Sequence, residues 1–414
     1  MGGLFKTILM LLSSTMLSSI FTFITQLVVA RYLCPDEFGI VISSLTLVVL
    51  VSPLLSIVLD GYILKHFAKY EGICAGFMST SVRYLLCTIP PTLLLFLIIG
   101  ADIGVFFYLL VVSQFFINIT IALKQVEGNF NRVSLILTFQ SFIRLTLLLP
   151  LVFLSSISVN SVYIIYVLSS LIVIVFLCTQ IKGTLNSPVV KEKCNEISLK
   201  QLFLNAYPFG IGVFLHLIYF QSAILILGKL DSVASAGLYG VAFTILTLAY
   251  LVPGVVFQRY FLPQIHQLTE QGKDKQLMSI FSNGFMMMLI VGIIGTLVFM
   301  TLSEYIIYYS FGDKYLDSVS ILKTLSICIL LRYLSSSAGV FLVSGSLVVK
   351  KNKYMAICAV FNLLLNIILI PLYGISAAIY VTIASEVILM LLFFRGVFKY
   401  KFVNHSPYQL LLRR

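Results

Sequence analysis

Apolar stretches of about twenty residues recur along the whole chain, and short charged or turn-forming segments separate them. A helix crosses the hydrocarbon of a bilayer in about 20 residues, so each stretch is long enough to span a membrane. Only 10% of the 414 residues are charged, whereas a soluble domain carries about 25%. The chain is therefore predicted to be an all-α polytopic membrane protein. This composition excludes a sizeable soluble catalytic or nucleic-acid-binding domain.

Twelve transmembrane helices account for these stretches, and the loops between them are short. The first stretch is too long for the apolar region of a cleaved signal peptide, so we interpret it as a retained helix. We predict the spans at 5–30, 38–62, 78–100, 103–123, 133–156, 160–181, 202–228, 233–257, 277–301, 318–349, 354–371 and 374–397.

The distribution of Lys and Arg indicates the orientation. Cytoplasmic loops of membrane proteins carry an excess of these residues. Threading twelve spans with the N-terminus inside places 21 of the 27 on the cytoplasmic side and four on the other, with two inside spans. Both termini are therefore predicted to be cytoplasmic. The formal net charge of +12 is interpreted as this orientation signal and as attraction to anionic lipid of the inner leaflet, with no nucleic-acid partner.

The two halves of the sequence contain similar segments. RYLCPDEFG at 31–39 and LDSVASAGLYG at 230–240 both precede a predicted span, and both end on an aromatic-Gly pair. Each span then carries a proline, Pro53 or Pro253. Chance similarity between apolar helices is one explanation, and duplication of a six-helix unit, a common layout in transporters, is the other. We predict a six-helix bundle over 1–181, a cytoplasmic linker over 182–201, and a second six-helix bundle with a short basic tail over 202–414.

Four blocks resemble the polysaccharide exporters of the multidrug/oligosaccharidyl-lipid/polysaccharide (MOP) superfamily. ARYLCPDEFGIVISSLTLVV (30–49) resembles their first loop and second helix, and GLYGVAFTILTLAYLVPGVVFQRYFLPQIHQL (237–268) their eighth helix and the loop after it. FGDKYLDSVSILKTLSI (311–327) and YGISAAIYVTIASEVI (373–388) match segments before the tenth helix and in the twelfth. The chain looks most similar to Wzx-type O-antigen flippases, which have this length and span number.

This resemblance implies a MATE-like fold of two bundles and a function. The substrate would be an undecaprenyl-pyrophosphate-linked oligosaccharide repeat unit of O-antigen or a related surface polysaccharide. The protein would move it by alternating access from the cytoplasmic to the periplasmic leaflet of the bacterial inner membrane. The resemblance also implies membrane lipids, a polysaccharide polymerase and a chain-length regulator as candidate partners.

Arg144 is the first candidate for a substrate-binding residue. It lies about eleven residues into its span, or roughly 17 Å, which is near the bilayer midplane. Gln140 lies one turn before it on the same face. An Arg at that depth costs on the order of 3 kcal/mol or more unless it is paired or hydrated. We therefore expect Arg144 either in a wetted cavity, where it holds an anionic substrate, or in a structural ion pair.

Other charges in or near the spans have two interpretations each. Arg332 is a candidate substrate-binding cation and Glu386 a candidate H⁺ or Na⁺ site, but a plain salt bridge between them fits equally well. Asp60, near the inner end of the second span, is either a second ion-coupling residue or the partner of nearby lysines. Arg31, at the outer end of the first span, either contacts substrate or reaches toward lipid phosphates.

Polar stripes on three predicted helices suggest a wetted interior. Ser14, Ser18, Thr22 and Gln26 recur every four residues in the first helix, where the small hydroxyl residues suit helix packing. The amides are better candidates for contacts with sugar: Gln114 and Asn118 in the fourth helix, and Asn362 and Asn366 in the eleventh.

No cofactor or metal is expected, and no enzyme activity. The seven cysteines are scattered without a CxxC pair, and we interpret them as small apolar residues of the core. A lipid-dependent glycosyltransferase or a polymerase would need a large outer loop or an acidic metal motif, and the sequence has no DxD. The main alternative is a MATE-like multidrug or cation antiporter, in which buried acids would dominate the cavity.

Overall fold

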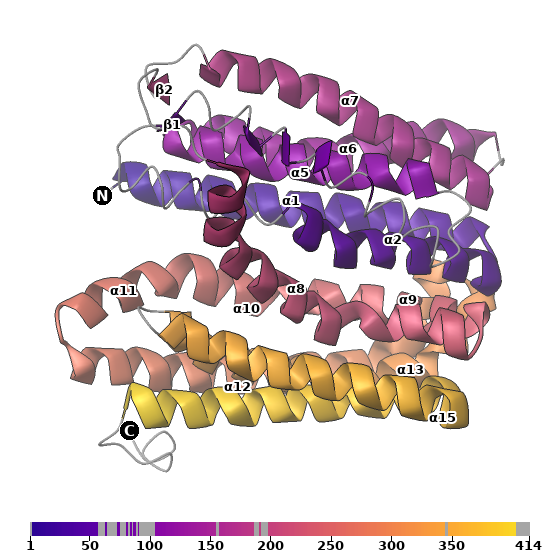
Figure 1. Ribbon diagram of the computed structural model, residues 1–414. Helices are drawn as coiled ribbons and strands as arrows, with labels where there is room; N and C mark the ends of the chain where they lie inside the picture. The colour runs from indigo at the N-terminus through magenta and orange to yellow at the C-terminus, as the bar shows by residue number, and fades with distance from the viewer. Residues whose placement is uncertain are drawn as a thin grey trace. The chain divides into compact units, whose positions relative to one another are not determined.

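The computed structural model describes residues 2–56, 104–154, 157–185, 190–191, 198–343 and 347–402, with isolated positions at 63, 73–74, 80–81, 83–84, 86–87 and 90. The described chain is helical apart from two short parallel strands, β1 (Ile73–Cys74) and β2 (Val190–Lys191). The helices, drawn in Figure 1, are α1 (Gly2–Tyr32), α2 (Pro35–Ser56), α5 (Gly104–Val126), α6 (Phe130–Phe153), α7 (Val159–Leu185), α8 (Leu199–Leu230), α9 (Val233–Ala249), α10 (Leu251–Pro253), α11 (Leu262–Glu270), α12 (Asp274–Phe311), α13 (Ser318–Leu325), α14 (Ile327–Gly339) and α15 (Leu347–Tyr400).

Ten helical stretches of the described chain are long and apolar enough to cross a membrane, with α15 counted once. They coincide with eleven of the predicted spans, so the prediction of a multi-pass helical membrane protein is confirmed. The remaining predicted span, 78–100, falls outside the described residues except at isolated positions. The count of twelve helices therefore stays a prediction, as does the cytoplasmic location of both termini.

The chain separates into two compact units. Unit 1 comprises Met1–Thr25 and Ser43–Leu217, and unit 2 comprises Gln26–Ile42 and Ile218–Arg414. The predicted division into 1–181, 182–201 and 202–414 stays a prediction.

Helices α5, α6 and α7 pack together in unit 1. Their contact is an apolar cluster around Ile117, Ile136 and Leu177, all buried. The rings of Phe139 and Phe176 lie against this cluster with centroids 4.4 Å apart. Interdigitated aliphatic and aromatic side chains of this kind hold helices together where lipid supplies no hydrophobic driving force.

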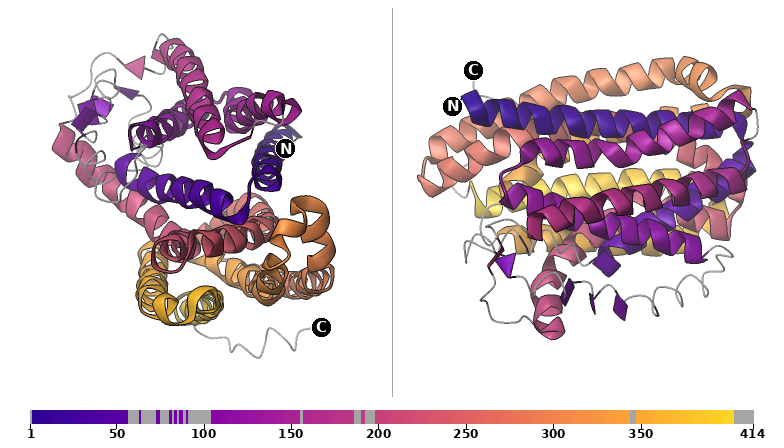
Figure 2. Two further views of the ribbon diagram at one scale, coloured as in Figure 1. Left: turned by 90° about the vertical axis from the view of Figure 1, so that its right-hand side faces the viewer. Right: turned by 90° about the horizontal axis from the view of Figure 1, so that it is seen from above.

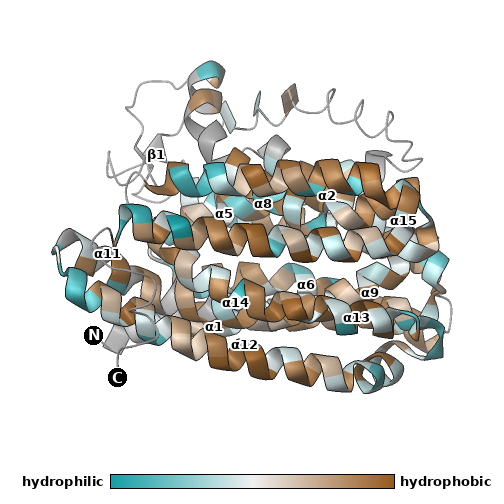
Figure 3. Ribbon diagram, turned by 90° about the horizontal axis from the view of Figure 1, so that it is seen from below, coloured by the Kyte–Doolittle hydropathy of each residue, from teal (hydrophilic) through white to brown (hydrophobic). Residues whose placement is uncertain are grey.

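Helices α12, α14 and α15 form the packed core of unit 2, and Figure 2 shows the two arms of α15 side by side. Phe281 of α12 is fully buried, and its ring centroid lies 5.1 Å from that of Phe341 and 5.4 Å from that of Phe402. In Figure 3 apolar colour predominates along α12, and side chains such as Ile290, Ile294 and Leu297 are exposed on its surface. An apolar exposed face of this length is what a lipid-facing helix requires.

Polar side chains cap the N-termini of two helices. Asn129 precedes α6, and its side chain accepts a hydrogen bond from the backbone N–H of Arg132. Ser232 precedes α9 and accepts in the same way from Ser235. These caps satisfy N–H groups that have no partner within the first turn of a helix.

Helix α15 is a hairpin of two helices. Gly374 has φ 55° and ψ −139°, a left-handed conformation that glycine adopts without strain. The arms before and after Gly374 run antiparallel (Figure 1), and Asn362 on the first donates a hydrogen bond to Ser385 on the second. This break agrees with the prediction of separate eleventh and twelfth spans.

The predicted span 233–257 is present over Val233–Pro253, with an irregularity at Tyr250. Helix α9 ends at Ala249, and a π-helix covers Gly254–Phe261 after the short α10. Pro253 has no N–H, so the carbonyl of Ala249, four residues earlier, loses its helical donor. The hydroxyl of Tyr333 in α14 donates to that carbonyl at 2.7 Å. The break is thus stabilised by a hydrogen bond from another helix.

The predicted span 318–349 is present over Ser318–Val343. It is divided at Ser326 into α13 and α14, and a 3₁₀ turn follows at Val340–Val343. The carbonyl of Ser326 accepts a hydrogen bond from Thr296 of α12 at 3.2 Å. Residues 347–349 belong to α15, not to this span.

Two glycines bring the starts of α2 and α9 into direct contact within unit 2. A Cβ on Gly39 would lie 1.9 Å from the carbonyl oxygen of Val233, and a Cβ on Gly237 would lie 2.1 Å from that of Pro35. The contacts are reciprocal, so Pro35 and Gly39 correspond to Val233 and Gly237. The comparison of segments 31–39 and 230–240 instead aligned Gly39 with Gly240, which lies three residues after Gly237.

Candidate functional site

Arg144 is a cation of unit 1 that lies in the middle of an apolar helix. It is near the middle of α6, and its guanidinium carbon lies 4.5 Å from the centroid of the Tyr166 ring on α7. The side chain is half-buried, and its Nε is buried without a hydrogen-bond partner. No carboxylate of the described chain forms an ion pair with Arg144.

Gln140 lies one turn before Arg144, and its amide donates to the hydroxyl of Ser113 on α5 at 3.1 Å. Ser113 is adjacent in the chain to Gln114, whose amide donates to Asn118 at 3.4 Å. Gln140 therefore meets α5 next to the predicted amide pair. The structure does not place Gln114 or Asn118 in contact with Arg144.

The polar stripe of α1 packs against α6. The hydroxyls of Ser18 and Thr22 lie 3.0 Å and 2.9 Å from that of Ser141, the residue after Gln140. Ser14 bonds within its own helix, to the carbonyl of Leu11. These contacts are those expected of small hydroxyl residues between packed helices.

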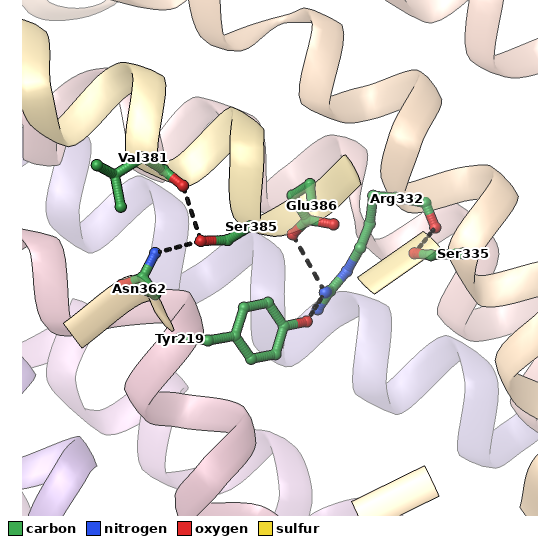
Figure 4. Close-up of polar contacts among 7 residues, drawn as sticks. All are labelled: Tyr219, Arg332, Ser335, Asn362, Val381, Ser385 and Glu386. Carbon is green, nitrogen blue, oxygen red and sulfur yellow. Dashed lines mark hydrogen bonds and ion pairs between the residues drawn. The ribbon is translucent and has the colours of Figure 1, made fainter. Parts of the chain in front are cut away.

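The second intramembrane cation, Arg332 of α14, is paired. Its Nη1 lies 3.4 Å from Oε1 of Glu386 on α15, and it donates to the hydroxyl of Tyr219 on α8 (Figure 4). The rings of Phe220 and Tyr250 flank its guanidinium carbon at 4.9 Å and 5.3 Å. The structure therefore contains the salt bridge that was one of the two interpretations of Arg332 and Glu386.

Glu386 retains one unused acceptor. Its side chain is 3% exposed, and Oε2 is buried without a hydrogen-bond partner. A buried carboxylate oxygen without a partner is costly unless a proton or a cation satisfies it. The geometry thus leaves room for an ion-coupling role beside the salt bridge.

Asn362 and Asn366 join helices of unit 2. Oδ1 of Asn362 accepts from Ser222 on α8 and from the amide of Asn366, at 3.2 Å and 2.9 Å. The Asn362 amide donates to Ser385 at 2.9 Å, and the Ser385 hydroxyl donates to the carbonyl of Val381 (Figure 4). Both asparagines are fully buried, and Oδ1 of Asn366 has no hydrogen-bond partner. This network fastens α8 to the two arms of α15.

Arg31 and Asp60 are the remaining predicted site residues. Arg31 is exposed at the end of α1, and its Nη1 donates to the carbonyl of Tyr309 at 3.1 Å. Asp60 lies outside the described residues.

The aromatic partners of the two arginines were missed in the sequence analysis. Tyr166, Tyr219 and Tyr250 are three of the 22 tyrosines of the chain. No spacing in the sequence links them to Arg144 or Arg332, because each pair joins different helices. The only signal available was the presence of an aromatic residue at a similar depth in another span.

We expect the effects of substituting Arg332 and Glu386 on the stability of the protein to depend strongly on each other. Glu386→Gln leaves the Arg332 charge without its counter-ion and should cost about 3 kcal/mol, as when one partner of a buried pair is removed. Replacing both, Arg332→Met with Glu386→Leu, should be close to neutral. Thermal unfolding in detergent, followed by far-ultraviolet circular dichroism, measures both. Equal losses for the single and the double variant would show that the charges are not coupled.

No protein-family model matches the sequence, and no curated protein matches it. Solved structures do match in fold. An inward-facing multidrug resistance MATE family transporter of the MOP superfamily matches with a TM-score of 0.68 and 13% identity, over 97% of this chain and 99% of that one. The lipid II flippase MurJ, in an inward closed conformation, matches with a TM-score of 0.64 and 13% identity, over 98% and 89%. A eukaryotic MATE transporter matches with a TM-score of 0.63 and 14% identity, over 98% and 97%.

These matches cover nearly the whole chain at low identity. The chain therefore has the fold of MOP-superfamily transporters, and the predicted MATE-like fold is confirmed at that level.

Proposed function

We propose that this protein is a flippase that moves undecaprenyl-pyrophosphate-linked oligosaccharide units of O-antigen or a related surface polysaccharide from the cytoplasmic to the periplasmic leaflet of a bacterial inner membrane. A lipid-linked glycan cannot cross unaided, because each hydroxyl that enters hydrocarbon loses its water partners at a cost of several kcal/mol. A transporter of this fold would supply a polar path by alternating access. A flippase of this kind would act together with a polysaccharide polymerase and a chain-length regulator.

Arg144 is the observation that carries the proposal. Its guanidinium carbon lies over the Tyr166 ring, while its Nε has no hydrogen-bond partner and no carboxylate of the described chain pairs with it. A half-buried guanidinium without a counter-ion is an attractive site for pyrophosphate, which it can bind through two parallel hydrogen bonds. An anionic headgroup would thus supply the charge that the protein does not.

Glu386 is the residue we assign to ion coupling, with H⁺ or Na⁺ as the ion. Its Oε1 faces Arg332 and its Oε2 is unpartnered. A proton or a cation on this carboxylate would weaken its hold on Arg332 and free that cation for substrate. A ligand shifts a conformational equilibrium in this way when it binds one state better than the other. Asp60 stays the second candidate for coupling.

The membrane potential favours outward movement of the headgroup. A charge that crosses an inside-negative potential gains about 2.3 kcal/mol per 100 mV, so two negative charges gain about 4 to 5 kcal/mol if both cross the field. Binding to Arg144 during transit would cancel part of this gain. Direction can thus come from the potential, with ion coupling as a supplement.

Export of drugs or cations is the second candidate function, because MATE transporters are among the structural neighbours. A cationic substrate needs an acidic site. In the described chain Arg144, in the middle of the apolar helix α6, has no carboxylate partner, whereas Glu386 is already paired with an arginine. This charge pattern favours an anionic substrate.

Reconstitution into liposomes separates the two functions. Purified protein should speed the exposure of a fluorescent undecaprenyl-pyrophosphate-linked oligosaccharide to a membrane-impermeant quencher, relative to protein-free liposomes. A cationic dye should show no protein-dependent efflux under a proton or Na⁺ gradient. Dye efflux without movement of the lipid-linked glycan would contradict the proposal and support the antiporter.

A further inference from the structure

The open end of the α15 hairpin carries an unusual concentration of positive charge. The first arm begins, and the second arm ends, with basic residues separated by long apolar stretches. We call this group the basic end of α15; it consists of Lys350, Lys351, Lys353, Arg395, Lys399 and Lys401.

The apolar arms set the depth of this basic end. The stretches 355–372 and 375–394 hold Glu386 as their one charged residue. At 1.5 Å per residue they span roughly 27 to 30 Å, which is the thickness of the hydrocarbon. The basic end therefore lies at the level of the lipid headgroups. This placement holds whichever side of the membrane it faces.

Two lysines of the basic end converge on one aromatic ring. The ammonium nitrogen of Lys350, in the first arm, lies 3.2 Å from the centroid of the Tyr400 ring, and that of Lys399, in the second, lies 5.4 Å from it. Gly396 allows this approach, because a Cβ there would lie 2.7 Å from the ring of Tyr354 on the first arm. The hairpin thus holds two positive charges around Tyr400.

These charges have no acidic partner in the described chain. Its ion pairs involve Lys124 and Arg332, and none involves Lys350 or Lys399. Lys401 differs, since it donates to the hydroxyl of Thr269 at 2.8 Å. Burial lowers the pKa of Lys401, and nearby Asp274 opposes that shift. Two ammonium groups that share one aromatic ring and have no carboxylate partner can attract an anion.

We propose that Lys350 and Lys399, converging on Tyr400, bind the phosphate of an anionic membrane lipid at the open end of α15. A lysine near an anionic membrane surface contributes about 1 kcal/mol to such an attraction. The phosphate oxygens accept hydrogen bonds from the two ammonium groups, one from each arm. The bound headgroup then links the two ends of the hairpin. This inference depends on the fold of α15 and not on the proposed substrate.

Titration of the detergent-solubilised protein with short-chain phosphatidylglycerol tests the site, with thermal unfolding as the measure of binding. The double variant Lys350→Gln with Lys399→Gln should weaken binding about 30-fold, which corresponds to about 1 kcal/mol for each lysine. The matched control removes two charges at the other end of unit 2, by Lys314→Gln with Lys323→Gln, both exposed. The control should change binding less than about twofold.

A second double variant distinguishes loss of lipid binding from loss of folding. Lys350→Arg with Lys399→Arg keeps both charges and should retain binding within about threefold. Equal loss of affinity in the Gln variant and the control would overturn the site. Equal stabilisation by phosphatidylcholine would overturn its preference for anionic lipid. Equal affinity for inorganic phosphate would show that free phosphate, and not a lipid headgroup, is the ligand.

Discussion

Arg144→Ala is expected to abolish surface polysaccharide while the protein stays folded in the membrane. The substitution removes the unpaired guanidinium that we propose binds the pyrophosphate. Loss of one partner of a hydrogen-bonded charge pair costs about 2 to 5 kcal/mol, so flipping of the lipid-linked oligosaccharide should slow by about 30-fold or more. The quenching assay in liposomes and surface polysaccharide in cells measure this effect.

Two further variants of α6 make this test specific. Arg144→Lys keeps the charge but loses the planar fork of donors, so it should retain part of the activity. Arg132→Ala removes an exposed cation near the start of the same helix and should leave flipping unchanged. Wild-type flipping in Arg144→Ala would remove the proposed anion site.

Gly39→Ala and Gly237→Ala are each expected to disrupt folding of unit 2. The added Cβ would lie 1.9 Å from the Val233 oxygen or 2.1 Å from the Pro35 oxygen, closer than real contacts allow. The backbone must therefore move, and overpacking of this kind costs about 1 to 3 kcal/mol, or more where backbone meets backbone. Thermal unfolding and size-exclusion chromatography in detergent should show a lower midpoint and a smaller folded fraction.

Gly183→Ala is the matched control for these glycines. Gly183 lies in α7, and a Cβ there meets nothing within 4 Å. Alanine has a higher helix propensity than glycine, so this variant should be neutral or more stable by up to about 1 kcal/mol. Equal stability of Gly39→Ala and Gly183→Ala would refute the close approach of α2 and α9.

Much of the candidate site could be anticipated from individual residues, but their partners could not. The depth of Arg144 follows from its position in an apolar stretch, because helical rise and bilayer thickness are both constant. Whether Arg144 forms an ion pair or stays an unpaired cation depends on which residue another helix places at the same depth. The structure presents Tyr166 there, and it presents Glu386 to Arg332.

Apolar composition alone determined that this chain is a bundle of membrane-spanning helices, because backbone groups in hydrocarbon must bond within their own helix. Tertiary structure decided where those helices break. At the breaks, Tyr333 and Thr296 on other helices donate hydrogen bonds to the carbonyls of Ala249 and Ser326. It also decided which buried charges are neutralised, since an ion pair needs two side chains that only the packing of distant segments brings together.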